Sequence, residues 1–451
     1  MTDRLFHVGY LYDGERLYHD SEVFVRDGRI HAILCRNDSN RDAQAVRRLF
    51  DAAEQIDLPG GFLLPGLINS HHHAYSALAR GMPLNQSFPN FPAILEGLWW
   101  RLDEVLDEDA VRISALVTAL DSIRHGCTIV LDHHSSPHFV RGSLDVIAHA
   151  FNRLNMTAAL CYETTDRNGP EAFREAAEEN LRFYHANRDH NLRRGMFGLH
   201  ASFTLSDDSL QEIARVKPEA MPIHVHVAED TSDVEDAHAR GYAGPFARLQ
   251  QFGLWNETSL AVHGVHMSSD ERTMAKEIGV GVVHNPESNC NNRVGYADPA
   301  AFRNDRILLG TDGMSSDMIA SLRSAYLLQA AYGNPDVDRM ALAHQLLFRN
   351  PAQFVARLFG REVGTLRVGA SADFAIFRYP SPTPVTADNW LSHFIFGLAN
   401  RSEAAWVYAN GEAVLENGAF ATVDEVDILA EARSIADHLW KRFQAHARGS
   451  R

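Results

Sequence analysis

The sequence predicts an α/β protein in which a TIM-like (β/α)8 barrel carries a small β-sandwich domain formed by the N- and C-terminal segments. Eight short apolar or β-branched segments alternate with helical patterns after residue 62, and polar residues gather at their ends. The terminal regions instead contain short strands with turns. With 451 residues the chain is long enough for a barrel of about 250 residues and a companion domain.

Eight predicted strands follow one another along the middle of the chain. They cover residues 62–73, 127–134, 156–165, 195–206, 221–230, 259–266, 280–289 and 306–313. Helical patterns lie between them, as in residues 171–187, and Ser268 with Glu271 forms the capping-box pattern that begins a helix. Because eight is the strand number of this barrel, we expect the barrel to span residues 63–362.

The regions on either side of the barrel have a different pattern. Residues 1–62 and 363–424 contain short β-type segments separated by turns, and we expect them to pair into the two parts of the β-sandwich. Residues 425–451 carry an apolar stripe at helical spacing, which predicts a C-terminal helix that serves packing.

The composition predicts a soluble cytoplasmic protein. No apolar run approaches the roughly 20 residues of a membrane span, and the first residues do not resemble a secretory signal. The formal net charge of −16 and the absence of a Lys/Arg stripe argue against nucleic acid as a partner. The four cysteines are far apart and include no C-x-x-C pair, so we expect neither a disulfide framework nor a thiolate metal site.

Three consecutive histidines end the first predicted barrel strand. In a strand, residues i and i+2 face the same way about 6.6 Å apart, so His71 and His73 converge while His72 points away. Two imidazoles at this spacing can bind one metal ion with bonds of about 2.0–2.1 Å. A single histidine, by contrast, is more often a core residue.

Compatible metal ligands end other predicted strands. His226 ends the fifth strand, His263 the sixth and Asp312 the eighth. Each alone could be a core histidine, a helix-entry residue or a turn aspartate, but their common place at one end of the barrel favours a metal site. His224, two residues deeper than His226, is expected to support a ligand or to fill the core.

These motifs together resemble the amidohydrolase superfamily, and within it the cytosine deaminase and chlorohydrolase branch. The resemblance rests on H-x-H after the first strand, H-x-x-E from His226 to Glu229, H-G at His263 and G-T-D-G at Asp312. Longer stretches, LWWRLDEVLDED, VHVAED and VHNPESNCNNRVGY among them, are similar to a subgroup of aminohydrolases called SsnA. The likeness covers nearly the whole chain.

The resemblance implies a role for each residue that matches a family motif. The implied metal ligands are His71, His73, His226 and Asp312, and the implied catalytic residues are Glu229, His263 and Asp312. His200 matches the histidine that contacts substrate after the fourth strand. Glu163 and Asn289 end the third and seventh predicted strands, where they could bind substrate or serve loop hydrogen bonds. The chain departs from the wider branch in having Gly264 and Asn285 where cysteines are common.

The lysine content predicts one divalent metal ion per chain. Binuclear members of the superfamily usually bridge two metals with a carboxylated lysine on the fourth strand, and no lysine occurs between residues 1 and 216. Lys217 precedes the fifth predicted strand, on the side away from the barrel mouth. Imidazole and carboxylate ligands suit Zn²⁺ or Fe²⁺ equally.

The expected activity is hydrolytic deamination of an aminated N-heterocycle of the purine, pterin or pyrimidine type, with release of ammonia. The same ligands also suit ring opening of a cyclic amide, or displacement of chloride or an alkylamine from a triazine. A non-catalytic barrel would lack a ligand or Glu229, and all are present. Trp99 and Trp100 could cover the site by stacking on a flat ring or belong to a helix core. We expect a small heterocyclic substrate and a homodimer, the commonest closed assembly.

Overall fold

The barrel is formed by short parallel strands. The computed structural model describes residues 3–84, 86–302 and 306–449. The barrel strands are β5 (Leu67–His72), β6 (Cys127–His134), β7 (Thr157–Tyr162), β8 (Arg193–Gly195), β9 (Phe197–Ala201), β10 (Ile223–Val227), β11 (Leu260–His263), β12 (Gly281–His284) and β13 (Ile307–Leu309). Each except β8 lies within one of the eight predicted segments, and β8 overlaps the fourth segment, residues 195–206, only at Gly195.

Two sheets close into the barrel through single bridges. One sheet has the order β5-β6-β7-β8 and the other β13-β12-β11-β10-β9, and all pairs are parallel. Isolated parallel bridges join His72 to Asp312 and Thr164 to Leu199. The predicted α/β barrel is thereby confirmed, with β8 and β9 acting as one interrupted strand.

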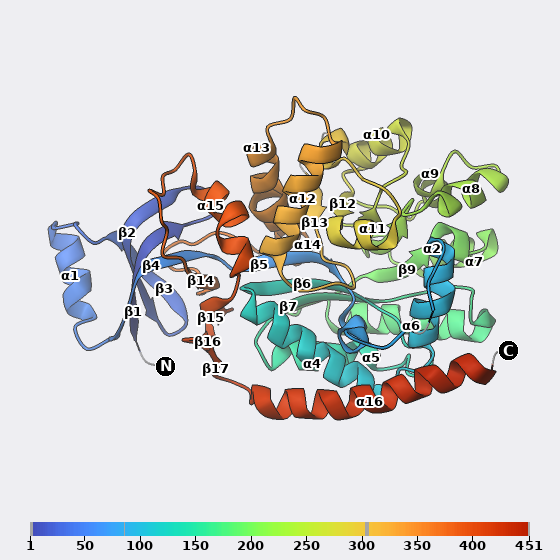
Figure 1. Ribbon diagram of the computed structural model, residues 1–451, viewed down its shortest axis with the longest axis horizontal. Coiled ribbons are helices and arrows are strands. Elements are labelled where there is room, and N and C mark those ends of the chain that lie inside the picture. The colour runs from blue at the N-terminus through green and yellow to red at the C-terminus, as the bar shows by residue number, and fades with distance from the viewer. Residues whose placement is uncertain (1–2, 85, 303–305, 450–451) are drawn as a thin grey trace.

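Helices surround the barrel strands (Figure 1). The main barrel helices are α4 (Glu108–Arg124), α5 (Ser143–Asn152), α6 (Gly169–Ala186), α7 (Asp207–Val216), α8 (Thr231–Ala239), α9 (Pro245–Gln251), α10 (Ser269–Ile278), α11 (Pro286–Asn292), α12 (Met318–Tyr332), α13 (Arg339–His344) and α14 (Asn350–Phe359). The capping box of Ser268 and Glu271 is present at the start of α10, as predicted.

Apolar side chains fill the barrel interior away from its carboxyl end. Ile68, Ile129, Val262 and Leu308 come from four strands and are buried together with Phe354 of α14. Near-continuous burial along each strand is typical of parallel sheets covered by helices on the outside. Polar chemistry is therefore confined to the opposite, carboxyl end of the strands.

The chain termini form a second sheet beside the barrel. Its strands are β1 (Arg4–Tyr12), β2 (Leu17–Arg26), β3 (Arg29–Cys35), β4 (Glu54–Pro65), β14 (Phe374–Arg378), β15 (Ala404–Ala409), β16 (Glu412–Glu416) and β17 (Ala419–Phe420), in the order β17-β16-β15-β14-β4-β1-β2-β3. The helix α1 (Arg41–Leu49) packs at one end (Figure 1). β4 continues past residue 62 to Pro65, directly before the first barrel strand.

This sheet curls on itself as a sandwich does. The Phe6 ring lies 5.5 Å from the rings of Phe374 and Trp406 and 5.9 Å from that of Tyr408. A flat sheet would place β15 about 14 Å from β1, three strand spacings away. The aromatic side chains of the two halves therefore face each other across a shared apolar core.

The C-terminal helix α16 (Glu425–Gly449) runs along the outside of the barrel beneath α4 and α5 (Figure 1). The Trp440 indole donates a hydrogen bond to the Leu78 carbonyl at 2.8 Å, and the Arg101 guanidinium lies 4.2 Å from the Phe443 ring centre. The helix thus packs against the segment that follows β5. Residues 450 and 451 of the predicted helix lie outside the described part of the chain.

Short helices between β5 and α4 carry side chains toward the barrel mouth. They are the 3₁₀ helix η1 (Ala74–Ala79), α2 (Phe91–Ile94), the π-helical turn η2 (Leu95–Trp99) and α3 (Trp100–Asp103). Four further short helices, η3 (Ser202–Thr204), η4 (Pro299–Phe302), η5 (Gln345–Arg349) and η6 (Leu398–Asn400), and α15 (Trp390–Phe396) complete the described elements. The four cysteines are free, and no helix in the described ranges has the length and apolar character that crossing a bilayer requires.

Candidate active site

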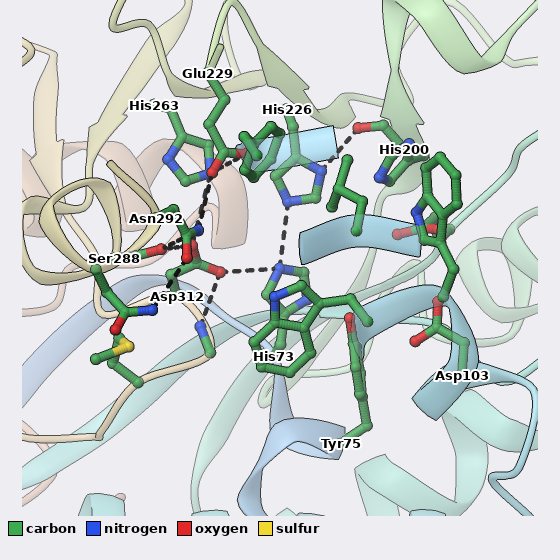
Figure 2. Close-up of a pocket in the computed structure, with 18 residues that line it drawn as sticks. His73, Tyr75, Asp103, His200, His226, Glu229, His263, Ser288, Asn292 and Asp312 are labelled. Carbon is green, nitrogen blue, oxygen red and sulfur yellow. Dashed lines mark hydrogen bonds and ion pairs between the residues drawn. The ribbon is translucent and has the colours of Figure 1, made fainter. Parts of the chain in front are cut away.

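An open cavity lies at the carboxyl ends of the barrel strands (Figure 2), and its empty space, including the part open to solvent, is about 600 Å³. Seven of the residues predicted for the site line it, namely His73, Glu163, His200, His226, Glu229, His263 and Asp312. His71 is fully buried beside this set, and Asn289 is buried behind His263. The barrel therefore brings together residues that are far apart in the sequence.

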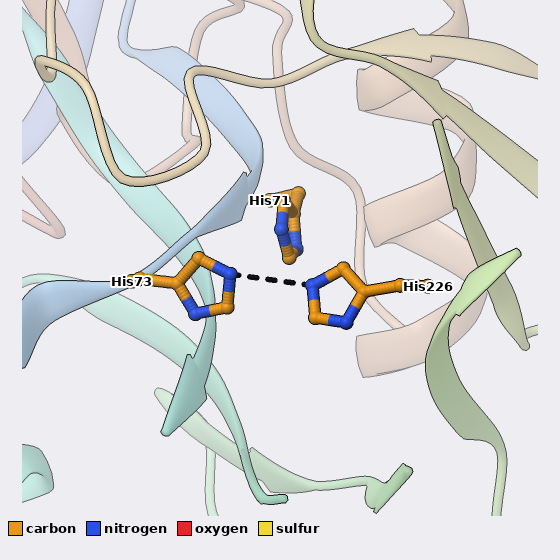
Figure 3. Close-up of side chains that lie close together, drawn as sticks. All are labelled: His71, His73 and His226. Atoms are coloured by element: carbon orange, nitrogen blue, oxygen red, sulfur yellow. Dashed lines mark hydrogen bonds between the residues drawn. The ribbon is translucent and has the colours of Figure 1, made fainter. Parts of the chain in front are cut away.

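Four side chains place their metal-binding atoms at the distances of a tetrahedral site. His73 Nε2 lies 3.1 Å from Asp312 Oδ1 and 3.3 Å from His226 Nε2, and His71 Nε2 lies 3.5 Å from Asp312 Oδ1. Ligand bonds of about 2.0–2.1 Å in a tetrahedron require ligand atoms about 3.3 Å apart. Figure 3 shows the three histidines turned toward one common point.

Backbone carbonyls fix two of these histidines in the tautomer that metal binding needs. His73 Nδ1 donates to the His133 carbonyl at 2.6 Å, and His226 Nδ1 donates to the His200 carbonyl at 2.8 Å. Because a carbonyl only accepts, each Nε2 atom is left with a lone pair that points to the centre of the cluster.

His71 obtains the same tautomer from another histidine. Its Nδ1 atom lies 2.8 Å from His224 Nε2, and its Nε2 atom is buried without a hydrogen-bond partner. A buried nitrogen without a partner costs stability, and a metal ion would satisfy it. The sequence predicted that His224 either supports a metal ligand or fills the core. Its contact with His71 Nδ1 means that it supports a ligand. The donor set fits a divalent metal ion.

Asp312 and His263 adopt strained backbone conformations at their strand ends, with φ values of 56° and 72°. Burial raises the pKa of Asp312, but the facing His71 and His73 rings outweigh burial and hold this pKa well below its usual range. Ser288 Oγ donates to Asp312 Oδ2 at 2.5 Å. Asp312 is therefore an ionised carboxylate.

His263 stands between the metal-binding cluster and Glu229. Its Nδ1 atom donates to Asn289 Oδ1 at 2.8 Å, which turns Nε2 into the cavity. Nε2 lies 3.3 Å from Glu229 Oε2 and 3.7 Å from Asp312 Oδ2. Asn289 is not among the cavity-lining residues, so its contact is with His263 and not with the cavity.

The Glu229 carboxyl group gains and loses its proton near neutral pH. Burial raises its pKa to about 7, and the nearby Asp312 carboxylate acts in the same direction, while His263 opposes them. Asn292 Nδ2 donates to Glu229 Oε1 at 3.3 Å and leaves the rest of the carboxyl group toward the cavity. A carboxyl group with this pKa can both donate and accept a proton.

The side of the cavity away from Ser288 and Asp312 contains residues that sequence reasoning did not assign to the site. Tyr75 and Asp103 lie on this side (Figure 2). Glu163 also lines the cavity, and Arg167 contacts both Glu163 and Asp103. The only sequence signal for Asp103 was its place three residues after the paired tryptophans. Both Trp99 and Trp100 line the cavity, and the Trp100 ring centre lies 6.0 Å from that of His200.

Comparison with known proteins places these features in context. The profile described as the amidohydrolase family matches residues 62–414. A 5-methylthioadenosine/S-adenosylhomocysteine deaminase of Desulforudis audaxviator is 29% identical over 409 residues, which cover 88% of this chain and 91% of the relative. A 5'-deoxyadenosine deaminase of Methanopyrus kandleri is 26% identical over 436 residues, or 94% and 96% of the two chains.

Solved structures share the fold over nearly the full length. An adenosine deaminase of Xanthomonas campestris with bound zinc superposes with a TM-score of 0.81 at 24% identity, covering 97% of this chain and 98% of that one. An atrazine chlorohydrolase of Arthrobacter aurescens complexed with zinc gives 0.75 at 20% identity, covering 96% and 100%. The enzyme is a hydrolase acting on carbon–nitrogen bonds, and the chain belongs to the amidohydrolase family.

Proposed function

We propose that this enzyme hydrolytically deaminates an aminated N-heterocycle, and that its substrate is an adenine nucleoside. The observation that carries the proposal is Glu229, a buried carboxyl group with a pKa raised to about 7 that faces the metal-binding cluster across the cavity. The two relatives quoted above are named as deaminases of adenine nucleosides, which supports the same reaction.

The residues divide the proton transfers of such a reaction between them. His71, His73, His226 and Asp312 would hold a divalent metal ion, which would supply Lewis-acid activation of a water molecule. Asp312 is ionised and accepts a proton of that water at its carboxylate. His263 Nε2, 3.7 Å from Asp312 Oδ2, is left as an acceptor by the bond from its Nδ1 to Asn289, so it orients the water by accepting a hydrogen bond from it.

Glu229 supplies the proton that the heterocycle needs. Its carboxyl group donates to the ring nitrogen next to the reacting carbon while the water's hydroxyl forms a bond to that carbon. The exocyclic amine then takes the proton that Asp312 had accepted and leaves as ammonia when its bond to carbon breaks. The remaining hydroxyl proton returns to Glu229 as the carbonyl forms, which restores both carboxyl groups. The net change is one water consumed and one ammonia released.

We propose a single metal ion, Zn²⁺ or Fe²⁺. A second group of ligand atoms, on His133, Glu163 and His226, also lies close enough to hold an ion. However, His226 Nδ1 is bonded to the His200 carbonyl, so His226 has only Nε2 to offer and cannot serve both groups. Lys217 donates to the carbonyls of Pro218 and Met221, before β10 and away from the cavity. Elemental analysis showing two ions per chain would contradict this proposal.

The decisive experiment is a substrate panel in ¹⁸O-labelled water. Metal-loaded enzyme is incubated with adenine nucleosides, pterins, pyrimidines, triazines and cyclic amides, and products are identified by mass spectrometry. We expect adenine nucleosides in which one labelled oxygen replaces the amine. Addition of a whole water to a cyclic amide, or loss of chloride from a triazine, with every nucleoside unchanged, would overturn the proposal.

A further inference from the structure

The cavity combines acidic side chains with an absence of fixed positive charge. Four carboxyl groups line it, and none of the described residues that line it is a lysine or an arginine. Glu229 and Asp312 belong to the reaction proposed above. Asp103 and Glu163 have no part in it, although both line the cavity, and Arg167 contacts both. Asp103 lies on the side away from Asp312 (Figure 2), so the non-reacting end of a substrate would face it.

The Arg167 guanidinium group, which contacts both Asp103 and Glu163, is already engaged in other interactions. It forms an ion pair with Glu163, lies 3.6 Å from Asp103 and donates from Nε to Thr165 Oγ1 at 3.3 Å. Its central carbon lies 4.6 Å from the ring centre of Trp100. The Arg167 cation thus faces the carboxyl groups of both Asp103 and Glu163, and Arg167 is not one of the residues that line the cavity.

Asp103 retains an unused acceptor. Its side chain is only 3% exposed, and its Oδ1 atom has no hydrogen-bond partner among the described residues. Burial and the nearby Glu163 carboxylate raise the pKa of Asp103 to about 8 against the opposing effect of Arg167, so its charged form is favoured near neutral pH only where a donor group faces it. A buried acceptor of this kind is satisfied by a group that donates hydrogen bonds.

We propose that the carboxyl groups of Asp103 and Glu163, here called the Asp103–Glu163 wall, select substrates whose non-reacting end donates hydrogen bonds and bears no negative charge. Glu163 determines this specificity by holding Arg167 away from the cavity. The proposal rests on the proposed function, since it concerns the same cavity. Hydroxyl and ammonium groups both meet the requirement. Carboxylate and phosphate groups do not, because they offer no donor to Asp103 and would face Glu163 without a free cation, since Glu163 holds Arg167.

The wild-type enzyme gives the first test. Deamination of adenosine, 5'-amino-5'-deoxyadenosine and adenosine 5'-monophosphate is followed by ammonia release, and kcat/KM is compared. We expect kcat/KM for the monophosphate to be lower than for the other two by a factor of at least about 10, the factor that one unfavourable charge contact produces. The ratio between the hydroxyl and ammonium substrates tells which donor the wall prefers.

The outcomes separate the two proposals. If no adenine nucleoside is deaminated, the proposed function fails. If adenosine is deaminated but the monophosphate reacts as well as adenosine does, the proposed function stands and the charge selection is wrong.

Glu163→Gln tests the role given to Glu163. The variant keeps the shape of the side chain but weakens its hold on Arg167, so we expect the preference for adenosine over the monophosphate to fall by about tenfold. Glu179→Gln is the matched control, because Glu179 is also a buried partner of an arginine, Arg182 at 2.7 Å, but lies on α6 outside the cavity lining. An unchanged preference in Glu163→Gln, equal to that of the control, would overturn the role of Glu163.

Asp103→Asn tests the acceptor separately. An amide oxygen accepts hydrogen bonds less strongly than a carboxylate, so we expect KM for adenosine to rise by about tenfold while kcat changes little. A fall in kcat without a rise in KM would contradict a binding role for Asp103.

Discussion

Glu229 has the burial and the surroundings of a proton-transfer residue. If it acts as proposed, Glu229→Gln keeps the size and the contact with Asn292 but cannot transfer a proton, and kcat falls by about 10²–10⁴. Bound metal, measured by elemental analysis, stays at the wild-type level because Glu229 is not a ligand. Loss of metal in this variant would instead make Glu229 a support for the ligand histidines.

The raised pKa of Glu229 also predicts a pH dependence. The proton that Glu229 donates is present below its pKa of about 7 and is lost as the pH rises through that value. We expect kcat/KM for adenosine, whose adenine ring does not titrate in this range, to fall about tenfold per pH unit above the pKa of Glu229. A profile that stays level to pH 9 would exclude Glu229 as the donor.

His224 gives a prediction about metal affinity. It holds His71 in the metal-binding tautomer through a 2.8 Å contact, and loss of such a partner typically costs 10- to 100-fold in affinity, so we expect about this loss in His224→Ala, measured by chelator competition. His224→Gln retains an acceptor and should recover part of the affinity. His134→Ala is the control, because the His134 side chain bonds to Ser136 and not to a ligand.

At the scale of elements, α16 braces the short helices that carry the tryptophans and Asp103. Phe443 packs under Arg101 and is 4% exposed. We expect Phe443→Ala to lower the free energy of unfolding by about 3 kcal/mol and to raise KM more than it changes kcat. Lys441→Ala, which removes an exposed side chain of the same helix, is the control for both denaturation and kinetics. An unchanged KM in Phe443→Ala would mean that the packing of α16 against these short helices does not affect substrate binding in the cavity.

The sequence identified the barrel elements well because each strand is an apolar run buried on both faces. It located the cluster because His71, His73, His226, His263 and Asp312 all lie at strand ends, where topology alone brings them together. The seventh strand shows where this reasoning stops. We expected residues 280–289 to be a strand, but β12 ends at His284 and α11 begins at Pro286.

The helix α11 decides which polar side chains of this segment reach the cavity. Ser288 and Asn292, four residues apart on α11, face it together, while Asn289 points at His263. Asp103 was missed for a related reason. The π-helical turn before it breaks the regular spacing of side chains, so no periodic pattern predicts which of its residues face the barrel.

At the scale of the whole molecule, the metal-binding cluster spans the joint between the two barrel sheets. His71 lies on β5 and His73 directly follows it, whereas His226 lies on β10 and Asp312 follows β13 in the other sheet. An isolated bridge from His72 to Asp312 joins the two sheets at this edge. Metal should therefore stabilise the barrel, by about 4 kcal/mol when free metal exceeds the dissociation constant 1,000-fold. We expect a chelator to lower the melting temperature and Zn²⁺ to restore it, and identical melting curves would contradict this.

The interleaving of the termini in one sheet has a consequence for protein synthesis. β4 ends at residue 65, and its sheet neighbour β14 begins only at residue 374. At about 5–20 residues per second, a ribosome needs roughly 15 to 60 seconds to make the intervening chain. During that time the apolar edge formed by Phe62, Leu63 and Leu64 has no partner strand, which exposes the nascent chain to aggregation and gives chaperones a defined segment to protect.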